Sequence, residues 1–406
     1  MPRERSHVTA STPVYDAVVV GAGPAGTMAA HELAQGGARV LLLEKARLPR
    51  YKPCGGGLTA RARAVSPLVP RFAPEARAGT ILLPCRRQLL SCPLPAPLTM
   101  VMRDQFDAYL AARAVAAGAE LRDGSALTGL ERAGRDVRLV AGGETVTARY
   151  VVGADGATGA TARLAGFAPV SRTGAPAIEV ELAVPDAVRA RYADAIVVDA
   201  LAVHGGYGWI FSKGEHLSVG VGALLPAGQH TLRASLTRFL ATHAGLSEGR
   251  TLLQRGHSIP LAGQRTAWRR GPIVLAGDAA GLGDPLTGEG ISYALASGRR
   301  AGRAVLDALG AEPGALDRYE RFIAGTLGGD LRYARWVAAL AYRYPVPFLE
   351  ALAAHEELRT VVAHAICGAL PYQTLARRLM RRAACFVPYV TPAHRPGGLL
   401  LPESLE

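Results

Sequence analysis

A glycine-rich turn between a strand-like and a helix-like segment constrains the fold of this chain most. Residues 16–20 form a short, mostly apolar run typical of a buried parallel strand, and the sequence Gly-Ala-Gly-Pro-Ala-Gly follows at once at 21–26. Helix-forming residues continue to 35, and 39–44 predicts a second strand. This is the βαβ setting of a dinucleotide-binding fingerprint, in which the helix N-terminus binds the pyrophosphate. The sequence therefore predicts a doubly wound α/β domain.

Each glycine of the fingerprint has its own physical role. Gly21 permits the tight turn, Gly23 lets a pyrophosphate approach the backbone, and Gly26 lets the helix pack closely on the strand. Glu44 ends the second strand, where its carboxylate can accept hydrogen bonds from a ribose. The residues expected to bind the dinucleotide here are Gly21, Gly23, Ala25, Gly26, Glu44 and Lys45.

Two later turns place an aspartate directly after a predicted strand. Asp155 follows the strand that ends at 152, and Gly277 and Asp278 follow the buried run at 273–275. Because α/β sheets bind ligands beyond the carboxyl ends of their strands, both aspartates are candidate ligands of the same dinucleotide. Either motif alone is more typical of an ordinary turn.

The rest of the chain indicates an inserted antiparallel region and a helical C-terminus. The other predicted elements are helices at 103–118 and 291–309, strands at 120–122, 127–130, 137–140, 145–148, 150–152, 177–182, 195–203, 217–221 and 273–275, and helices from 316 that break at Pro345, Pro347 and Pro371. We therefore expect a doubly wound domain at 1–65, 100–165 and 266–312, an inserted antiparallel substrate domain at 66–99 and 166–265, and a helical region at 313–406.

Two motifs lie outside the dinucleotide fingerprint. Arg50–Leu58 has the sequence RYKPCGGGL, in which the glycines allow backbone to pass close to a flat ligand. At 207–213 the sequence YGWIFSK places Tyr207, Trp209, Phe211 and Lys213 on one face of a strand. Cys54 within the first motif could equally be an inert packed thiol, and an aromatic stripe is more often plain core. The glycines around this stripe favour a wall that faces a ligand.

Together these motifs resemble the geranylgeranyl reductase family of FAD-dependent oxidoreductases, within the para-hydroxybenzoate hydroxylase-like flavoprotein superfamily. The family has a Pro-Cys-Gly-Gly loop near the flavin and a Tyr-x-Trp-x-Phe-Pro-Lys strand along a prenyl cavity. The resemblance covers about residues 15–309. Ser212 stands where the family usually has proline, which puts the curvature of that strand in doubt.

The resemblance implies noncovalent FAD as cofactor and a Rossmann-like FAD-binding domain. Asp278 would bind the ribityl chain, Arg103 would contact the pyrophosphate side, and Asp155 would support a turn near the cofactor. The helix that begins at Ile291 would point its N–H groups at the N1–C2=O edge of the flavin. The further FAD contacts expected are Cys54, Gly55, Gly56, Arg103, Asp155, Gly277, Asp278, Pro285, Gly288, Gly290 and Ile291.

The activity implied is saturation of C=C bonds in a prenyl chain by flavin hydride transfer and protonation. Tyr207 and Cys54 are the candidate proton donors or positioning residues, and a water held by Tyr207 is an alternative. Trp209, Phe211 and Gly206 would line the substrate cavity. The substrate would be a prenyl lipid or prenyl diphosphate. NAD(P)H would reduce the flavin and would have to bind transiently, since the sequence has no second fingerprint; ferredoxin is the alternative donor. Two alternatives stay open, an FAD-dependent aromatic or polyketide monooxygenase and a noncatalytic prenyl-lipid-binding flavoprotein.

Composition limits the partners, the metal content and the cellular location that we expect. The formal net charge is +13, and nearly all basic residues are arginine, which GC-rich coding alone can explain. No nucleic-acid motif accompanies this charge, so we expect no nucleic-acid partner. The five cysteines share no metal-binding or disulfide pattern, so we expect no metal and a cytoplasmic protein. Arginines beside apolar residues at 331–340 and 375–387 leave peripheral binding to an anionic membrane open, against the alternative of helices packed on the protein.

Overall fold

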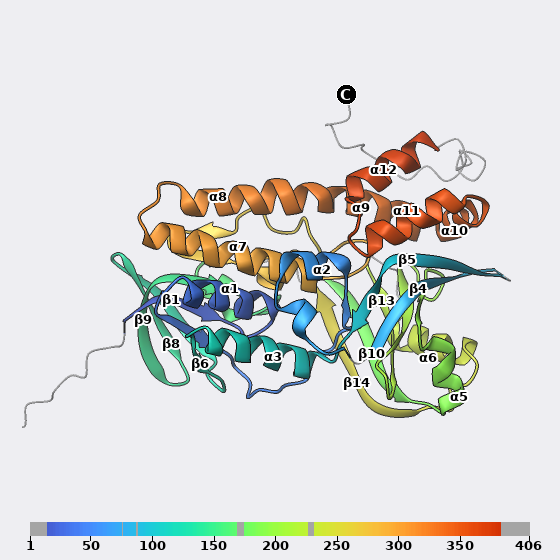
Figure 1. Ribbon diagram of the computed structural model, residues 1–406, viewed down its shortest axis with the longest axis horizontal. Helices are drawn as coiled ribbons and strands as arrows, with labels where there is room; N and C mark the ends of the chain where they lie inside the picture. Colours follow the sequence, from blue (N-terminus) through green and yellow to red (C-terminus); the bar gives the residue numbers. More distant parts are fainter. Residues whose placement is uncertain (1–13, 75, 87, 169–173, 226–230, 383–406) are drawn as a thin grey trace, which may run out of the picture.

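The computed structural model describes residues 14–74, 76–86, 88–168, 174–225 and 231–382, which fold around two eight-stranded sheets (Figure 1). The first sheet has the order β15-β16-β9-β1-β2-β6, and β7 and β8 continue it as a hairpin from β9. Its strands are β1 Val14–Val20, β2 Val40–Leu43, β6 Glu120–Arg122, β7 Leu127–Ala133, β8 Asp136–Ala141, β9 Glu144–Gly153, β15 Arg269–Arg270 and β16 Ile273–Leu275.

Parallel pairing in the first sheet brings the predicted ligand-binding turns to one edge. β1 pairs in parallel with both β2 and β9, and β16 pairs in parallel with β9. The carboxyl ends of these four strands therefore meet where Gly21, Glu44, Ala154 and Ala276 follow them. This arrangement confirms the predicted doubly wound α/β fold.

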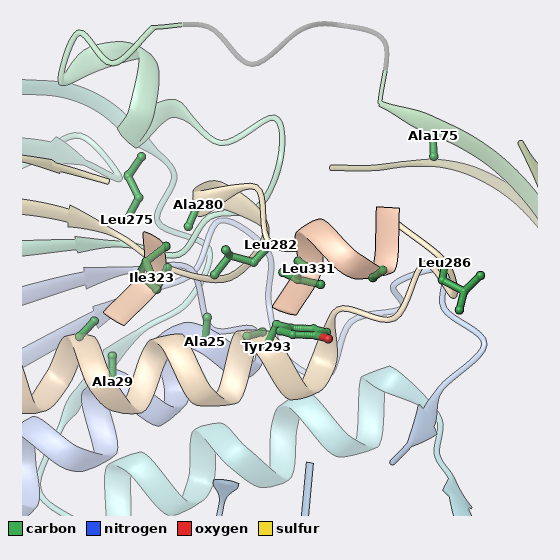
Figure 2. Close-up of a cluster of buried hydrophobic side chains, with 14 of the residues drawn as sticks. Ala25, Ala29, Ala175, Leu275, Ala280, Leu282, Leu286, Tyr293, Ile323 and Leu331 are labelled. Carbon is green, nitrogen blue, oxygen red and sulfur yellow. The ribbon is translucent and has the colours of Figure 1, made fainter. Parts of the chain in front are cut away.

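Two helices of this domain are in backbone contact. They are α1 (Pro24–Gln35) and α7 (Ile291–Leu309). A Cβ at Gly298 of α7 would overlap the Ala25 carbonyl of α1, and a Cβ at Gly302 of α7 would crowd the Ala29 carbonyl of α1. Figure 2 shows Ala25 and Ala29 facing α7, near the buried Tyr293. Figure 1 shows α3 (Arg103–Ala116) beside α1.

The second sheet is mostly antiparallel, as predicted, and has the order β14-β10-β13-β12-β11-β4-β5-β3. Its strands are β3 Gly57–Leu58, β4 Ala76–Cys85, β5 Gln88–Met100, β10 Ala175–Ala183, β11 Ala195–Asp199, β12 Gly206–Ser212, β13 Leu217–Ala223 and β14 Arg250–Ile259. One face buries Val180, Ile210 and Val219 against the short helix α5 (Asp186–Arg189) and α6 (Leu232–Thr242). The domain boundaries stay a prediction, because a sheet assignment does not test independent folding.

The structure differs from the sequence prediction in three details of the two sheets and their helices. The predicted strands at 145–148 and 150–152 are one continuous strand, β9. The strand predicted at 195–203 ends at Asp199, because the Asp199 carboxylate accepts the Leu201 N–H at 2.8 Å and starts a turn. The helix α6 was not predicted; Thr231 caps it by accepting the Ala234 N–H.

The C-terminal region is helical, as predicted, and two of its breaks fall at the predicted prolines Pro345 and Pro371. The break predicted at Pro347 is wrong, because Pro347 lies in the first turn of α10, where a proline fits a helix. Pro345 opens a helix and Pro371 precedes one. The C-terminal helices are α8 Ala315–Arg321, α9 Gly328–Arg343, α10 Pro345–Ala354, α11 Glu356–Ile366 and α12 Tyr372–Arg381, with a π-helical segment at Phe322–Leu327. Two short helices, α2 Ala60–Val65 and α4 Ala160–Leu164, lie earlier in the chain. Figure 1 shows α8 running beside α7, and α9–α12 near the end of the molecule that holds β4 and β5.

The apolar faces of the two segments considered for membrane binding are covered. Leu331 in α9 and Leu375 and Leu379 in α12 are each 1 % exposed or less. The arginines on these helices project outward, so the structure favours the alternative of helices packed on the protein. Phe386, part of the second segment, lies outside the described residues. Within the described ranges, no helix combines the length and apolarity that crossing a bilayer requires.

Candidate functional site

A cavity of about 740 Å³ connects the carboxyl edge of the first sheet to the inner face of the second. At one end its lining includes Gly21, Gly23, Glu44 and Lys45 of the fingerprint unit. At the other end it is lined by sheet residues and by α9, α10 and α11. An elongated ligand and a second, apolar ligand can therefore share one continuous space.

The fingerprint has the geometry that a dinucleotide requires. Gly21 has φ +102°, a conformation that favours glycine, and a Cβ at Gly26 would overlap the Gly21 carbonyl. The N-cap of α1 is Gly23, which offers no side-chain cap, so the first N–H groups of the helix are open to an anion. Glu44 Oε2 accepts the Ala22 N–H at 2.9 Å, which ties the end of β2 to the turn.

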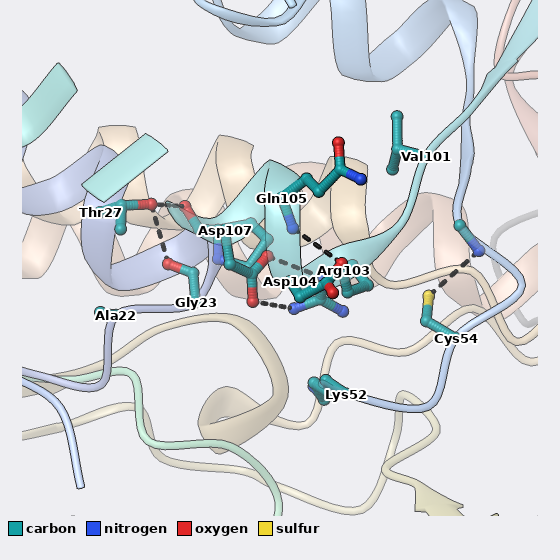
Figure 3. A network of polar contacts seen from close by, with 12 residues as sticks. Ala22, Gly23, Thr27, Lys52, Cys54, Val101, Arg103, Asp104, Gln105 and Asp107 are labelled. Atoms are coloured by element: carbon teal, nitrogen blue, oxygen red, sulfur yellow. Dashed lines mark hydrogen bonds and ion pairs between the residues drawn. The ribbon is translucent and has the colours of Figure 1, made fainter. Parts of the chain in front are cut away.

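A buried ion network supports the expected pyrophosphate position (Figure 3). Arg103 makes two 2.8 Å hydrogen bonds to Asp107, and Arg50 reaches the same carboxylate at 2.8 Å. Burial disfavours the charge on Arg103, but the negative charge of Asp107 outweighs the effect of burial, so the pKa of Arg103 is raised. The guanidinium groups of Arg103 and Arg50 both lie near Gly23, about 4 Å from where a Cβ there would be. The motif at 50–58 thus contributes a second cation that sequence reasoning had not assigned to the cofactor.

The predicted ribityl ligand lies on the wall of the cavity. Asp278 Oδ2 accepts a hydrogen bond from Lys52 Nζ at 3.2 Å. Burial opposes its charge, but Lys52 and His257 hold the pKa of Asp278 below its usual value. A Cβ at Gly290 would lie 3.3 Å from Asp278 Oδ1, so the start of α7 is beside this carboxylate.

The Cys54 loop is anchored from the second sheet. Lys213, only 2 % exposed, donates to the Gly55 carbonyl at 2.7 Å and to the Val101 carbonyl at 2.8 Å. A Cβ at Gly55 would press into the Phe211 ring, and Gly56 has φ +69°. The Gly56 N–H donates to Cys54 Sγ at 3.4 Å (Figure 3). The loop therefore lies tightly between the two sheets, with the sulfur at the cavity.

The aromatic stripe faces the cavity, as predicted. Tyr207, Trp209 and Phe211 all line it, and each ring is about 6 Å from the next. The neighbouring strand β13 has Gly222 and Gly220 opposite Tyr207 and Trp209, and a Cβ at Gly220 would collide with the Trp209 ring. The missing side chains leave room for the rings and for a ligand beside them. Lys213 lies just beyond β12 and holds the loop.

Tyrosines from three elements hold the loop 284–290 that precedes α7. Tyr207 donates to the Thr287 carbonyl, and Tyr342 of α9 donates to the Leu286 carbonyl. Tyr372 of α12 donates to Asp284 Oδ2 at 2.7 Å. Asp284 is 1 % exposed, and its other oxygen accepts backbone N–H groups of the loop. The C-terminal helices therefore fix the loop expected at the edge of the flavin.

One expectation about α7 is only partly met. The helix starts at Ile291, beside the cavity, as predicted. However, Glu289 accepts the Ser292 N–H at 2.6 Å, so one N–H group of the first turn is already satisfied by a side chain. Burial raises the pKa of Glu289.

Most of the predicted site residues line one cavity, and a few shape it from behind. The predicted residues that line it are Gly21, Gly23, Ala25, Glu44, Lys45, Cys54, Gly55, Gly56, Arg103, Asp155, Tyr207, Trp209, Phe211, Asp278, Gly288, Gly290 and Ile291. Those that do not are Gly26, Gly206, Gly277 and Pro285. Asp155 accepts both the N–H and the hydroxyl of Thr161, which supports the turn after β9 as expected.

Sequence reasoning missed a pair of carboxylates on β10. Glu179 lines the cavity, and Glu181 lies two residues further on the same face of the strand. Both are only 4 % exposed and both bind the hydroxyl of Tyr51. The alternation Ile-Glu-Val-Glu-Leu within a predicted strand was the available signal, because it puts charges on a face that the chain has to bury.

Comparison with known proteins agrees with this geometry. Residues 14–323 match the FAD binding domain family model. The chain is 32% identical over 309 residues to a geranylgeranyl diphosphate reductase of Rhodobacter capsulatus, covering 72% of this chain and 75% of that one. It is also 32% identical over 372 residues to digeranylgeranylglycerophospholipid reductase 1 of Methanopyrus kandleri, covering 85% and 96%.

Solved structures show the same fold. A geranylgeranyl bacteriochlorophyll reductase-like protein of Thermoplasma acidophilum superposes with a TM-score of 0.75 at 23% identity, covering 91% of this chain and 99% of that one. The anhydrotetracycline hydroxylase OxyS of Streptomyces rimosus gives 0.65 at 23% identity, covering 87% and 76%. The residues at the carboxyl edge fit FAD, because an uncapped helix N-terminus, two arginines and an acidic residue at the end of β2 meet there. From its FAD-binding domain and its relatives, the chain is a member of the geranylgeranyl reductase family of FAD-dependent oxidoreductases.

Proposed function

We propose that this protein saturates C=C bonds of a geranylgeranyl-type prenyl chain. The observation that carries the proposal is the apolar wall of the cavity beyond Cys54. Aliphatic and aromatic side chains from the second sheet, the loop 284–290 and α9, α10 and α11 make up this wall, and Glu179 is a carboxylate that also lines the cavity. The side chains of the wall are Leu83, Leu98, Met100, Ile196, Val198, Ala200, Tyr207, Trp209, Phe211, Leu286, Ala341, Tyr342, Phe348, Leu349, Leu352, Val362 and Ile366. A hydrocarbon chain fits this wall, and relatives named for two geranylgeranyl substrates support the choice.

The chemistry requires a dry site because an isolated alkene has no carbonyl to stabilise charge. Reduced FAD supplies a hydride to one carbon of the double bond when it is bound. The protein holds the double bond of the prenyl chain beside the cofactor and excludes water with Trp209 and Phe211. It also delivers a proton to the carbon that does not receive the hydride. Cys54 is the donor that we propose, since its thiol lies in the loop between the cofactor end and the apolar end of the cavity.

Tyr207 has a different role in this proposal. Its hydroxyl already donates to the Thr287 carbonyl, and its ring stacks on Tyr342 at 6.2 Å. Burial, and then the charge of Asp284, raise the pKa of Tyr207, which makes the hydroxyl a weaker acid. Tyr207 therefore positions the loop 284–290 and forms part of the cavity wall.

The experiment is a product analysis with anaerobically reduced protein. Geranylgeranyl diphosphate and digeranylgeranylglycerophospholipid are incubated separately with the photoreduced holoprotein under argon, and the extracts are measured by mass spectrometry. The proposal expects a mass gain of one or more hydrogen pairs on at least one substrate. Flavin that consumes oxygen and hydroxylates an aromatic substrate, without any hydrogenated prenyl product, would establish the monooxygenase alternative instead. If no reductant reduces the bound flavin, the noncatalytic alternative is established.

The electron donor and the location are part of the same proposal. NAD(P)H or ferredoxin reduces the bound FAD, and stopped-flow reduction with each donor distinguishes them. The protein works in the cytoplasm, where its prenyl substrate arrives either from an anionic membrane surface or in soluble form.

A further inference from the structure

A short row of polar groups leads from the surface to the wall of the cavity. Glu179 Oε1 accepts the Cys54 N–H at 2.8 Å and a hydrogen bond from the Tyr51 hydroxyl at 2.9 Å. The same hydroxyl lies 3.1 Å from Glu181 Oε1. Glu181 Oε2 in turn lies 3.1 Å from Nε2 of His216, whose side chain is 17% exposed. The row therefore begins at a partly exposed imidazole and ends beside the Cys54 loop.

The number of hydrogens in this row limits which of its groups can donate a hydrogen bond. A phenol has one hydrogen, so Tyr51 can donate to only one of the two carboxylates at a time. For both short contacts to be hydrogen bonds, the other carboxyl must itself be protonated and donate to the Tyr51 oxygen. The geometry thus calls for one extra proton shared between Glu179 and Glu181, as in other pairs of buried carboxyl groups.

We infer that Glu179, Tyr51, Glu181 and His216 form a relay that returns a proton to the cavity after each alkene reduction. This inference rests on the function proposed above, because only a reaction that consumes a proton in a dry cavity needs such a supply. Glu179 acts through Cys54, so it is a proton-relay and positioning residue. The catalytic donor to carbon remains Cys54.

The charges around Glu179 are consistent with this role. Burial, and then the neighbouring Glu181, raise the pKa of Glu179 to about 7, against smaller opposing effects of Tyr51, Lys213 and the Cys54 N–H. Arg255 is opposite Glu179 in the β14 register but is exposed to solvent. The carboxyl can therefore gain and lose a proton near neutral pH, which suits a relay.

The transfer balances without any change in electrons. The thiol of Cys54 gives its proton to the carbon that does not receive hydride, and the thiolate takes a proton from the Glu179 carboxyl. Glu179 then receives the hydrogen of Tyr51 while Tyr51 receives the proton of Glu181. Burial, and then the two carboxylates, raise the pKa of Tyr51, so it passes the proton without persisting as a phenolate. Glu181 is reloaded by His216, and His216 by water.

A purely structural role for Glu179 is the competing interpretation. In that case the carboxylate only accepts the Cys54 N–H and shapes the loop. Glu179→Gln distinguishes the two, because the amide oxygen still accepts that N–H but cannot release a proton. Tyr51→Phe interrupts the row and leaves Glu179 in place. Tyr150→Phe is the matched control, since Tyr150 loses a comparable hydrogen bond, to the Ala308 carbonyl, and does not line the cavity.

The first measurement does not depend on activity. Infrared difference spectra of the holoprotein between about pH 6 and about pH 8, spanning the raised pKa of Glu179, should show a protonated carboxyl that loses its proton. The signal should be absent in Glu179→Gln and present in Tyr150→Phe. A wild-type spectrum without it, or a Glu179→Gln spectrum that retains it, overturns the inference even if the protein reduces prenyl chains.

The second measurement is the pH profile of alkene reduction at equal FAD content and equal thermal stability. Wild-type turnover should fall as the pH rises through about 7, because the relay requires the acid form of Glu179. Glu179→Gln and Tyr51→Phe should each lower turnover by about 10²-fold and lose this limb of the profile. Wild-type rates and profile in Glu179→Gln assign it the structural role and overturn the relay. Failure of the wild-type protein to reduce any prenyl substrate refutes the proposed function and with it the relay, whereas a missing infrared signal in an active protein refutes the relay alone.

Discussion

Replacing Tyr207 by phenylalanine separates a proton donor from a residue that positions the flavin loop. The substitution removes one hydroxyl and keeps the ring that lines the cavity. Among the residues that the structure describes, that hydroxyl makes a single hydrogen bond, to the Thr287 carbonyl. A hydrogen bond between neutral groups contributes about 0.5–1.5 kcal/mol net, which converts to roughly a twofold to tenfold change in rate. A general acid contributes about 10²–10⁴-fold. The two roles therefore differ by at least an order of magnitude.

The assay is single-turnover oxidation of the reduced flavin by a prenyl substrate under argon. We expect Tyr207→Phe to slow it roughly twofold to tenfold, with FAD content unchanged. Tyr342→Phe is the matched control, because it removes the equivalent hydrogen bond to the Leu286 carbonyl from the other side of the loop. A loss of about 10²-fold or more in Tyr207→Phe, with Tyr342→Phe close to wild type, would refute the positioning role and make the Tyr207 hydroxyl the proton donor.

The remaining predictions concern the cofactor, the thiol and the surface. Asp278→Ala should raise the Kd for FAD roughly 10- to 100-fold, because a hydrogen bond to a carboxylate contributes about 1.5–3 kcal/mol; an unchanged Kd by fluorescence titration would remove Asp278 from the ribityl site. Cys54→Ala should slow alkene reduction about 10²–10⁴-fold and leave the reduction of the bound flavin intact, whereas wild-type turnover would show that another group supplies the proton. In liposome flotation at low salt, the fraction of the protein that floats with neutral vesicles should not exceed that of a soluble control protein, since Leu375 and Leu379 are buried. Strong binding to anionic vesicles alone would show that the exposed arginines suffice.

The sequence predicted the parts of this molecule that depend on local rules. The turn at Gly21 needs a positive φ, the run at 273–275 needs a buried strand, and Pro345 and Pro371 cannot continue a helix, so each feature is visible in neighbouring residues. The period of two residues along a strand likewise predicted that the cavity is lined by one face of β12, with Tyr207, Trp209 and Phe211.

The parts that sequence reasoning missed depend on partners far along the chain. Glu179 and Tyr51 are 128 residues apart, and only the pairing of the second sheet with the Cys54 loop brings them together. The link between Tyr372 and Asp284 spans 88 residues. The positioning role that we propose for Tyr207 depends on a distant partner in the same way, because its acceptor is the backbone carbonyl of Thr287, which no side-chain pattern reveals.

The central claim is that the apolar cavity holds a prenyl chain for hydrogenation beside bound FAD. The most direct test is a single turnover of the reduced holoprotein in deuterium oxide with a geranylgeranyl substrate under argon, followed by mass spectrometry of the product. We expect oxidised flavin and a product that has gained two hydrogens, at least one of them deuterium, because the thiol of Cys54 exchanges its hydrogen with the solvent. Unchanged substrate together with flavin that oxidises only when oxygen is admitted would contradict the central claim.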